Sequence, residues 1–307
     1  MNMNGLIIIT DERRVGGMLN AAKALGGQVV AAVVGPRSLA DAVSVWGFDR
    51  VLCLEPAPDV PAEAYAAQFA EAVMAAAPRV VLASDVPVSR ILLGAVAAKL
   101  NAAVVASVRA LAADGDNIVV SRSTAEGRVW EDIEVQGTLA AIFDGEDVEA
   151  SAVQPAAVEL IPADESGIAL RLVKVLESEG GDGLLTARRV VSAGAGLGNI
   201  EDLKLIEELA VTLGAEVGCS LPVCEDLRWL PAHQVVGSSH NQVAPELYIA
   251  VAISGQPQHM AGIRDAKVVV AINNDPEARI LKHCNYGIVG DAYKIVPALI
   301  TALKNAN

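Results

Sequence analysis

The sequence predicts an α/β protein of two domains, each built on a mostly parallel, doubly wound sheet. Apolar residues form 53% of the chain but aromatic residues only 3%, so Ala, Val, Leu and Ile must fill the cores. Short apolar runs alternate with helical patterns, and parallel strands buried on both faces have this Val- and Ala-rich composition. A length of 307 residues allows two such cores.

The first predicted domain covers residues 1–150. Buried strands are expected in it at 5–10, 28–35, 50–55 and 79–85. Apolar residues at helical spacing predict the intervening helices at 15–25, 38–47, 63–77 and 89–100. This alternation is typical of a parallel sheet with right-handed crossovers. After residue 103 the rhythm changes, and the runs at 117–123 and 135–143 are expected to be antiparallel strands appended to the sheet.

A connector and a second α/β domain are predicted next. Residues 151–185 carry acidic residues, Pro and Ser without a strong period, which indicates a partly structured connector before the domain at 186–307. Strands of that domain are predicted at 188–194, 215–220, 247–255 and 266–275. Asn199 is the expected N-cap of its first long helix, Gly214 ends that helix, and Asp291 caps the C-terminal helix.

Charge and cysteine usage exclude several classes of function. The net charge of −14, from 37 acidic and 23 basic residues, argues against a nucleic acid partner, because phosphate binding needs clustered Lys and Arg. No apolar run reaches membrane-spanning length without interruption, so no membrane insertion is expected. The four cysteines form no CxxC pair, which predicts reduced thiols in a cytoplasmic protein without a metal site. They are Cys53, Cys219, Cys224 and Cys284.

A glycine-rich turn follows the first strand of the second domain. Gly194, Gly196 and Gly198 have the spacing GxGxG rather than GxGxxG, and the next strand ends in Ser220 instead of an acidic residue. A nicotinamide dinucleotide site is therefore disfavoured. Two interpretations stay open: a turn whose backbone N–H groups meet an anion, or a tight turn without a ligand.

Polar side chains recur where the later strands of this domain end. In an open parallel sheet, ligands bind at the carboxyl ends of the strands, so this repetition indicates a long, polar, phosphorylated ligand. The polar residues in question are Ser220, Ser238, Ser239, His240, Asn241, Ser254, Gln258, His259, Asn273, Asp275 and Asp291.

The block VAPELYIAVAISGQPQHMAGIRDAKVVVAINNDPEA, followed by YGIVGD, resembles the C-terminal FAD domain of electron transfer flavoprotein alpha subunits. The resemblance runs from about Arg188 to the C-terminus and implies an FAD-binding, Rossmann-like domain. The N-terminal half resembles the family in fold pattern and in phrases such as LLGAVAAKLNAAVVASV. The segment GCSLPV is similar to the bacterial branch that serves carnitine reduction and nitrogen fixation.

The resemblance also implies a set of cofactor-binding residues. His259 is expected beside the pyrimidine end of the flavin ring, and Gln258 is expected to touch the flavin. An imidazole donor there would stabilise negative charge at N1 and O2 of the reduced ring, although a histidine satisfied inside the protein is the ordinary alternative. The full set comprises Gly194, Ala195, Gly196, Ser220, Leu221, Gly237, Ser238, Ser239, Ser254, Gly255, Gln258, His259, Asn273 and Asp291.

Other positions of this set match or depart from the family pattern. Ser239 matches a family threonine whose hydroxyl faces flavin N5, and Asn273 and Asp291 match positions near the AMP half of FAD. The family usually has Arg where this chain has Ala195 and Leu221. Either FAD binds without these two cations and has a lower potential, or Arg228 or His240 replaces one of them.

The resemblance implies an electron-carrier subunit with no substrate turnover of its own. Its expected partners are an electron transfer flavoprotein beta subunit, docked on the first domain in a heterodimer, and a flavoprotein dehydrogenase such as the acyl-CoA dehydrogenase type. The acceptor would be quinone-linked or a ferredoxin. Two alternatives stay open: a degenerate nucleotide-binding scaffold without a redox-active flavin, and the alpha subunit of an electron-bifurcating, NADH-linked flavoprotein.

Overall fold

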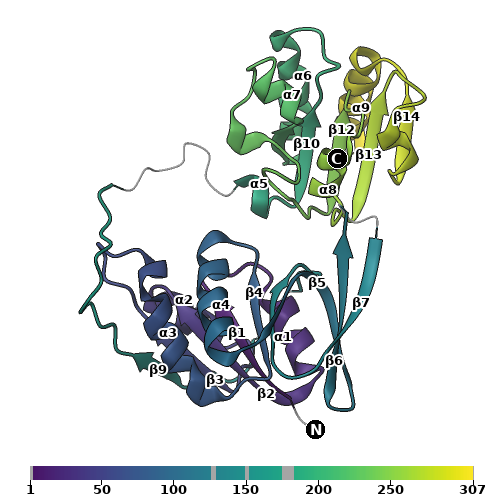
Figure 1. The fold of residues 1–307 in the computed structure, drawn as a ribbon. Helices are drawn as coiled ribbons and strands as arrows, with labels where there is room; N and C mark the ends of the chain where they lie inside the picture. Colours follow the sequence, from purple (N-terminus) through teal and green to yellow (C-terminus); the bar gives the residue numbers. More distant parts are fainter. Residues whose placement is uncertain (1–2, 126–128, 149–151, 175–182, 307) are drawn as a thin grey trace. The chain divides into compact units, whose positions relative to one another are not determined.

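The computed structural model describes residues 3–125, 129–148, 152–174 and 183–306. It confirms the predicted α/β class with two sheets of mostly parallel strands (Figure 1). The chain divides into two compact units, Met1–Val175 and Leu176–Asn307. None of the helices in the described ranges is long and apolar enough to cross a membrane.

The sheet of the first unit has the strand order β7-β6-β5-β8-β4-β1-β2-β3-β9. Only the β5–β6 and β6–β7 pairs among its described strands are antiparallel. The strands are β1 (Met3–Ile9), β2 (Gly26–Val34), β3 (Arg50–Leu54), β4 (Val80–Ser84), β5 (Ala103–Asp114), β6 (Asn117–Thr124), β7 (Val129–Val135), β8 (Leu139–Phe143) and β9 (Val158–Ile161).

Two layers of helices cover this sheet (Figure 1). Met18 of α1 and Val43 of α2 belong to the apolar core on one face. Phe69 of α3 and Leu92 of α4 belong to the core on the other face. The helices are α1 (Val15–Lys23), α2 (Arg37–Ser44), α3 (Ala66–Val73) and α4 (Pro87–Leu100), with 3₁₀ turns η1 (Ala62–Tyr65) and η2 (Met74–Ala76) beside α3.

The prediction of an antiparallel strand at 135–143 is wrong. β8 lies inside the sheet and pairs in parallel with β4 and β5. Leu139, Ala140 and Ala141 are fully buried, because an interior parallel strand is covered by helices or loops on both faces. The strand predicted at 117–123 is antiparallel, as expected, and corresponds to β6.

Part of the predicted connector belongs to the first sheet. β9 pairs in parallel with β3. Arg50 supports this edge, donating from Nε and Nη2 to the two carboxylate oxygens of Glu159 at 2.9 and 2.8 Å. The connector positions 151 and 175–182 lie outside the described residues.

The second unit has an all-parallel sheet with the order β11-β10-β12-β13-β14. Its central strand, β12, reads LYIAV, and four of its five residues are buried. The strands are β10 (Arg189–Ala193), β11 (Glu216–Cys219), β12 (Leu247–Val251), β13 (Val268–Asn273) and β14 (Tyr286–Val289).

Helices on both faces of this sheet complete the second unit. Ile206 of α6 and Val296 of α9 share one apolar core, whereas Leu184 of α5 and Ile280 of η5 belong to the core on the opposite face. The helices are α5 (Gly183–Thr186), α6 (Leu203–Leu213), α7 (Leu221–Glu225), α8 (Pro257–Gly262) and α9 (Ala292–Ala306), with 3₁₀ turns η3 (Ile200–Asp202), η4 (Ala232–Gln234) and η5 (Arg279–Lys282).

The predicted helix boundaries of this unit are confirmed. Asn199 begins the η3–α6 helix, and its backbone N–H donates to Asp202 Oδ2 at 2.8 Å. Gly214 ends α6 in the left-handed conformation, with φ 59°, which glycine adopts without the Cβ penalty. Asp291 Oδ1 accepts from the N–H of Tyr293 at 3.0 Å and so caps α9.

Candidate functional site

The carboxyl ends of the five parallel strands meet at one edge of the second sheet. Backbone hydrogen bonds join the loops there: Ser220 N–H donates to Ala193 O at 2.9 Å, and Gly194 N–H donates to Val251 O at 2.8 Å. Gly290 N–H donates to Asn273 O at 2.9 Å. These hydrogen bonds place Gly194, Ser220 and Asn273 along one rim of the sheet.

The glycine turn after β10 is packed closely against the end of β12. A Cβ on Gly194 would lie 2.0 Å from Ala252 O, and one on Gly196 would lie 3.0 Å from the same oxygen. Gly196 N–H donates to that carbonyl at 3.3 Å. Glycine is required here because any side chain would collide with backbone.

The side chain of Tyr293 engages the backbone N–H of Gly198, the third glycine of the turn. Its hydroxyl accepts from Gly198 N–H at 2.8 Å and donates to Asp202 Oδ2 at 2.7 Å. This hydrogen bond, together with the N–H of Asn199, holds the pKa of the Asp202 carboxyl below its usual range. An anion that binds Gly198 N–H would have to displace the Tyr293 hydroxyl.

Neither position where the family usually has Arg supplies a cation. Ala195 is exposed at the tip of the glycine turn, and Leu221 is the first residue of α7, directly after the buried Ser220. The two suggested substitutes, Arg228 and His240, are exposed. Arg228 also has a left-handed backbone, with φ 56°.

The turn at 237–239 lies against α8. Ser238 N–H donates to Gln258 O at 2.8 Å, and a Cβ on Gly237 would lie 3.3 Å from that oxygen. A Cβ on Gly262 would approach Gly237 N to 2.5 Å. The two backbones therefore touch, with Ser239 exposed beside them.

A second tight turn joins β12 to α8. Gly255 has φ +83°, and a Cβ there would lie 2.5 Å from Ile280 N. Ser254 O accepts from Ile280 N–H at 3.1 Å, while the Ser254 residue itself is exposed. The sequence prediction of a turn at these two residues agrees with this backbone.

His259 lies in the first turn of α8 and is only 6% exposed. Its Nε2 is 3.1 Å from the hydroxyl of the fully buried Tyr248, and its Nδ1 is buried without a hydrogen-bond partner. Burial lowers the pKa of His259 to about 4, against a smaller opposing effect of the Val236 carbonyl. The imidazole is therefore neutral at pH 7.

Asn273 and Asp291 hold their own loops together. Asn273 Nδ2 donates to Ile253 O at 2.8 Å, and its Oδ1 accepts from Asp275 N–H at 2.9 Å. Asp291 is the cap of α9. Their predicted contacts with the AMP half of a cofactor stay predictions.

Sequence reasoning missed three residues of this edge: Ser192, Tyr248 and Ala252. Tyr248 is the one polar side chain in the buried run LYIAV, and a buried hydroxyl needs a partner. That requirement was the available signal. For the φ of +57° at Ala252, the sequence carries no signal.

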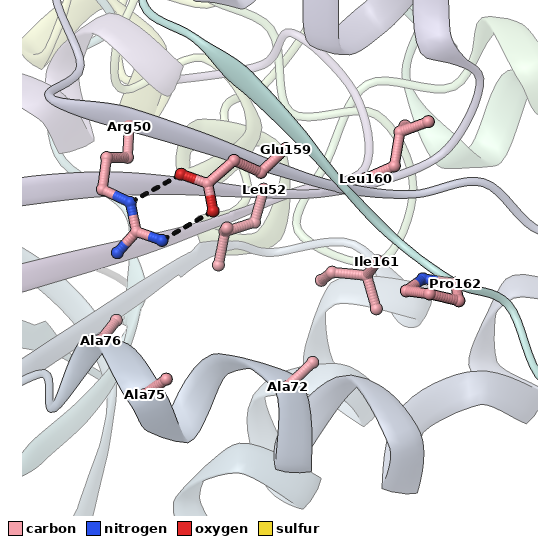
Figure 2. Close-up of a pocket in the computed structure, with 9 residues that line it drawn as sticks. All are labelled: Arg50, Leu52, Ala72, Ala75, Ala76, Glu159, Leu160, Ile161 and Pro162. Atoms are coloured by element: carbon pink, nitrogen blue, oxygen red, sulfur yellow. Dashed lines mark hydrogen bonds and ion pairs between the residues drawn. The ribbon is translucent and has the colours of Figure 1, made fainter.

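The first unit has a shallow groove at the β3–β9 edge (Figure 2). Alanines of α3 and η2 form one wall, and the Arg50–Glu159 ion pair closes one end. The charged groups of the groove neutralise one another, and none of the predicted site residues lies in it. Within the described ranges, no group of three or more His, Cys, Asp or Glu residues is placed to hold a metal ion.

The fold defines a two-unit α/β protein whose second sheet is all parallel, with polar and glycine-rich loops at the edge where open sheets of this type bind ligands. The family model described as the electron transfer flavoprotein FAD-binding domain matches residues 183–264, and the electron transfer flavoprotein domain matches 17–161. Protein FixB of Escherichia coli O81 (strain ED1a) is 33% identical over 294 residues, which cover 93% of each chain. The chain therefore belongs to the electron transfer flavoprotein alpha subunit family.

Other relatives match over shorter stretches of the chain but at higher sequence identity. YdiR of Escherichia coli (strain K12) is 49% identical over 121 residues, or 39% of each chain. FixB of Escherichia coli O139:H28 is 50% identical over 117 residues, or 38% of this chain and 37% of its own. These matches span under two fifths of the relatives' length.

Proposed function

We propose that the second unit binds FAD at the rim formed by the carboxyl ends of its strands, and that the protein relays electrons between a flavoprotein dehydrogenase and a redox acceptor. The observation that carries this proposal is the buried His259, whose Nδ1 has no partner, beside loops whose glycines allow close backbone approach. An unsatisfied buried nitrogen is unfavourable by roughly 1–3 kcal/mol. A carbonyl acceptor of a bound cofactor would remove that penalty.

The residues of the rim fit an extended nucleotide. The glycine turn packs its backbone directly against the end of β12 at Gly194 and Gly196, and the exposed Ser239 and Ser254 offer hydroxyls. When bound, FAD would supply the group that accepts and releases electrons. The chain's own residues would bind and orient it, with His259 as a neutral neighbour of the flavin ring. Because Nδ1 is buried, a cofactor would reach it only after a local rearrangement of the protein around the ring.

The first unit would dock a beta subunit, giving a heterodimer. Family membership supports this role, as it supports a dehydrogenase donor such as the acyl-CoA dehydrogenase type. The acceptor is proposed to be quinone-linked or a ferredoxin. A chain of this kind turns over no substrate by itself.

One observation favours a second candidate, a nucleotide-binding scaffold without a redox-active flavin. Ala195 and Leu221 leave the rim without the two cations that the family usually places there. Each charge-assisted hydrogen bond contributes about 1.5–3 kcal/mol, so their absence weakens binding of a phosphorylated, reducible ligand.

Co-expression of the full chain with a beta subunit, followed by an absorption spectrum and cofactor counting, separates these candidates. One FAD per heterodimer is expected, with flavin absorption bands. Two FAD per heterodimer would point to the bifurcating type. A folded, colourless heterodimer would contradict electron relay and favour the scaffold.

A further inference from the structure

Three buried polar side chains from three elements lie next to one another under the rim. Ser192 of β10 and Tyr248 of β12 are fully buried, and His259 of α8 is nearly so. The Tyr248 hydroxyl meets His259 Nε2 at 3.1 Å, with the two rings tilted by 56°. Ser192 Oγ makes no hydrogen bond of ordinary geometry. Its hydroxyl still lies close enough to Tyr248 to oppose the rise that burial causes in the pKa of that phenol.

The surroundings decide which imidazole nitrogen carries the hydrogen. The neutral ring has one donor and one acceptor nitrogen. The Val236 backbone carbonyl, an acceptor, favours a proton on the ring, and Nε2 is already engaged with Tyr248. A hydrogen on Nδ1 leaves Nε2 free to accept from the Tyr248 hydroxyl, while Nδ1, which has no hydrogen-bond partner among the described residues, is left for a ligand. Ser192 can in turn donate to the Tyr248 oxygen.

We propose that Tyr248 is a positioning residue that holds His259 in the neutral Nδ1–H form, so that any hydrogen bond from His259 to the cofactor leaves from Nδ1. The expected effect on FAD binding rests on the proposed function. The tautomer of His259 does not, because it can be measured in this chain without a cofactor. Tyr248 acts through His259 and needs no contact with the cofactor.

The first experiment requires no cofactor. Long-range ¹H–¹⁵N spectra of the full chain at pH 7 report the tautomer of each histidine, and the His259→Gln variant assigns the signal. We expect the Nδ1–H pattern in the wild type and a mixture of tautomers in Tyr248→Phe. Tyr65→Phe is the matched control, because Tyr65 is 1% exposed, accepts one hydrogen bond from Ala57 N–H and belongs to the first unit. An Nε2–H pattern in the wild type, or an unchanged pattern in Tyr248→Phe, would overturn the inference.

The second experiment measures FAD binding by the heterodimer. Tyr248→Phe is expected to raise the Kd for FAD about 2- to 10-fold, the effect of one misdirected neutral hydrogen bond, while Tyr65→Phe leaves it unchanged. An unchanged Kd alongside a changed tautomer would overturn the positioning role. Absence of FAD from the wild-type heterodimer would sink the proposed function and leave the tautomer assignment standing.

Discussion

Ala195 is the residue at which a single added charge should change cofactor affinity most. It is exposed at the tip of the glycine turn, so a longer side chain can be accommodated without repacking. Ala195→Arg is expected to tighten FAD binding at least about 10-fold, because a charge-assisted hydrogen bond contributes about 1.5–3 kcal/mol. Titration of the heterodimer with FAD measures the Kd.

Ala195→Gln is the control for this substitution, because it adds length and hydrogen-bonding groups without charge. The gain in Ala195→Arg should shrink at high ionic strength, since exposed charges are screened. Equal Kd values for the Arg and Gln variants would show that charge at this turn does not govern binding.

His259 should make the stability of the protein depend on pH in the acidic range. Its pKa falls from 6.5 to about 4 on burial, so the unfolded chain binds more protons between these values. The free energy of unfolding therefore has its full value above about pH 6.5. It decreases as the pH falls towards 4, by up to about 3 kcal/mol. The groups that face the ring are the Tyr248 hydroxyl and the Val236 carbonyl.

Denaturant unfolding at several pH values tests this dependence. The stability difference between wild type and His259→Gln should shrink as the pH is lowered from 7 to 4. His283→Gln, at an exposed histidine, is the control and should keep the wild-type slope. Parallel pH profiles for wild type and His259→Gln would contradict a neutral, buried imidazole.

At the scale of elements, the end of β12 stores backbone strain. Ala252 has φ +57°, a left-handed conformation that is unfavourable by roughly 1–2 kcal/mol for a residue with a Cβ. Ala252→Gly should therefore raise the free energy of unfolding by up to about 1 kcal/mol, after the larger backbone entropy of glycine in the unfolded chain is subtracted. Ala250→Gly, inside β12, should instead lower the free energy of unfolding. A destabilised Ala252→Gly variant would show that the conformation carries no strain.

Local signals in the sequence predicted the elements better than their pairing. Asn199 and Gly214 mark the ends of the α6 helix through their own side chain and backbone preferences. The direction of β8 depends on which strands lie beside it, and the place of β9 depends on a partner about 100 residues earlier in the chain. Such non-local pairing leaves little trace in a short apolar run.

At the scale of the whole molecule, the rim was predictable and its interior was not. In a parallel sheet all carboxyl ends meet at one edge, so polar residues after each strand indicate one site. The Tyr248–His259 contact is different, because it depends on the direction in which a ring enters the core. The separation of 11 residues between Tyr248 and His259 in the sequence does not indicate that direction.

The two units have separate hydrophobic cores, so FAD should stabilise one thermal transition of the full chain and leave the other unchanged. At a free FAD concentration of 100 times Kd, the stabilisation expected for the second unit is about 2.7 kcal/mol. Calorimetry with and without FAD measures this stabilisation.

Gly255→Ala identifies the transition of the second unit, because a Cβ would meet Ile280 N at 2.5 Å and the backbone has φ +83°. Gly115 has φ +59° and open space around a Cβ. Gly115→Ala should therefore lower the free energy of unfolding of the first unit by about 1–2 kcal/mol and so shift the other transition to lower temperature. If FAD shifted the transition that Gly115→Ala lowers, the binding site would belong to the first unit instead.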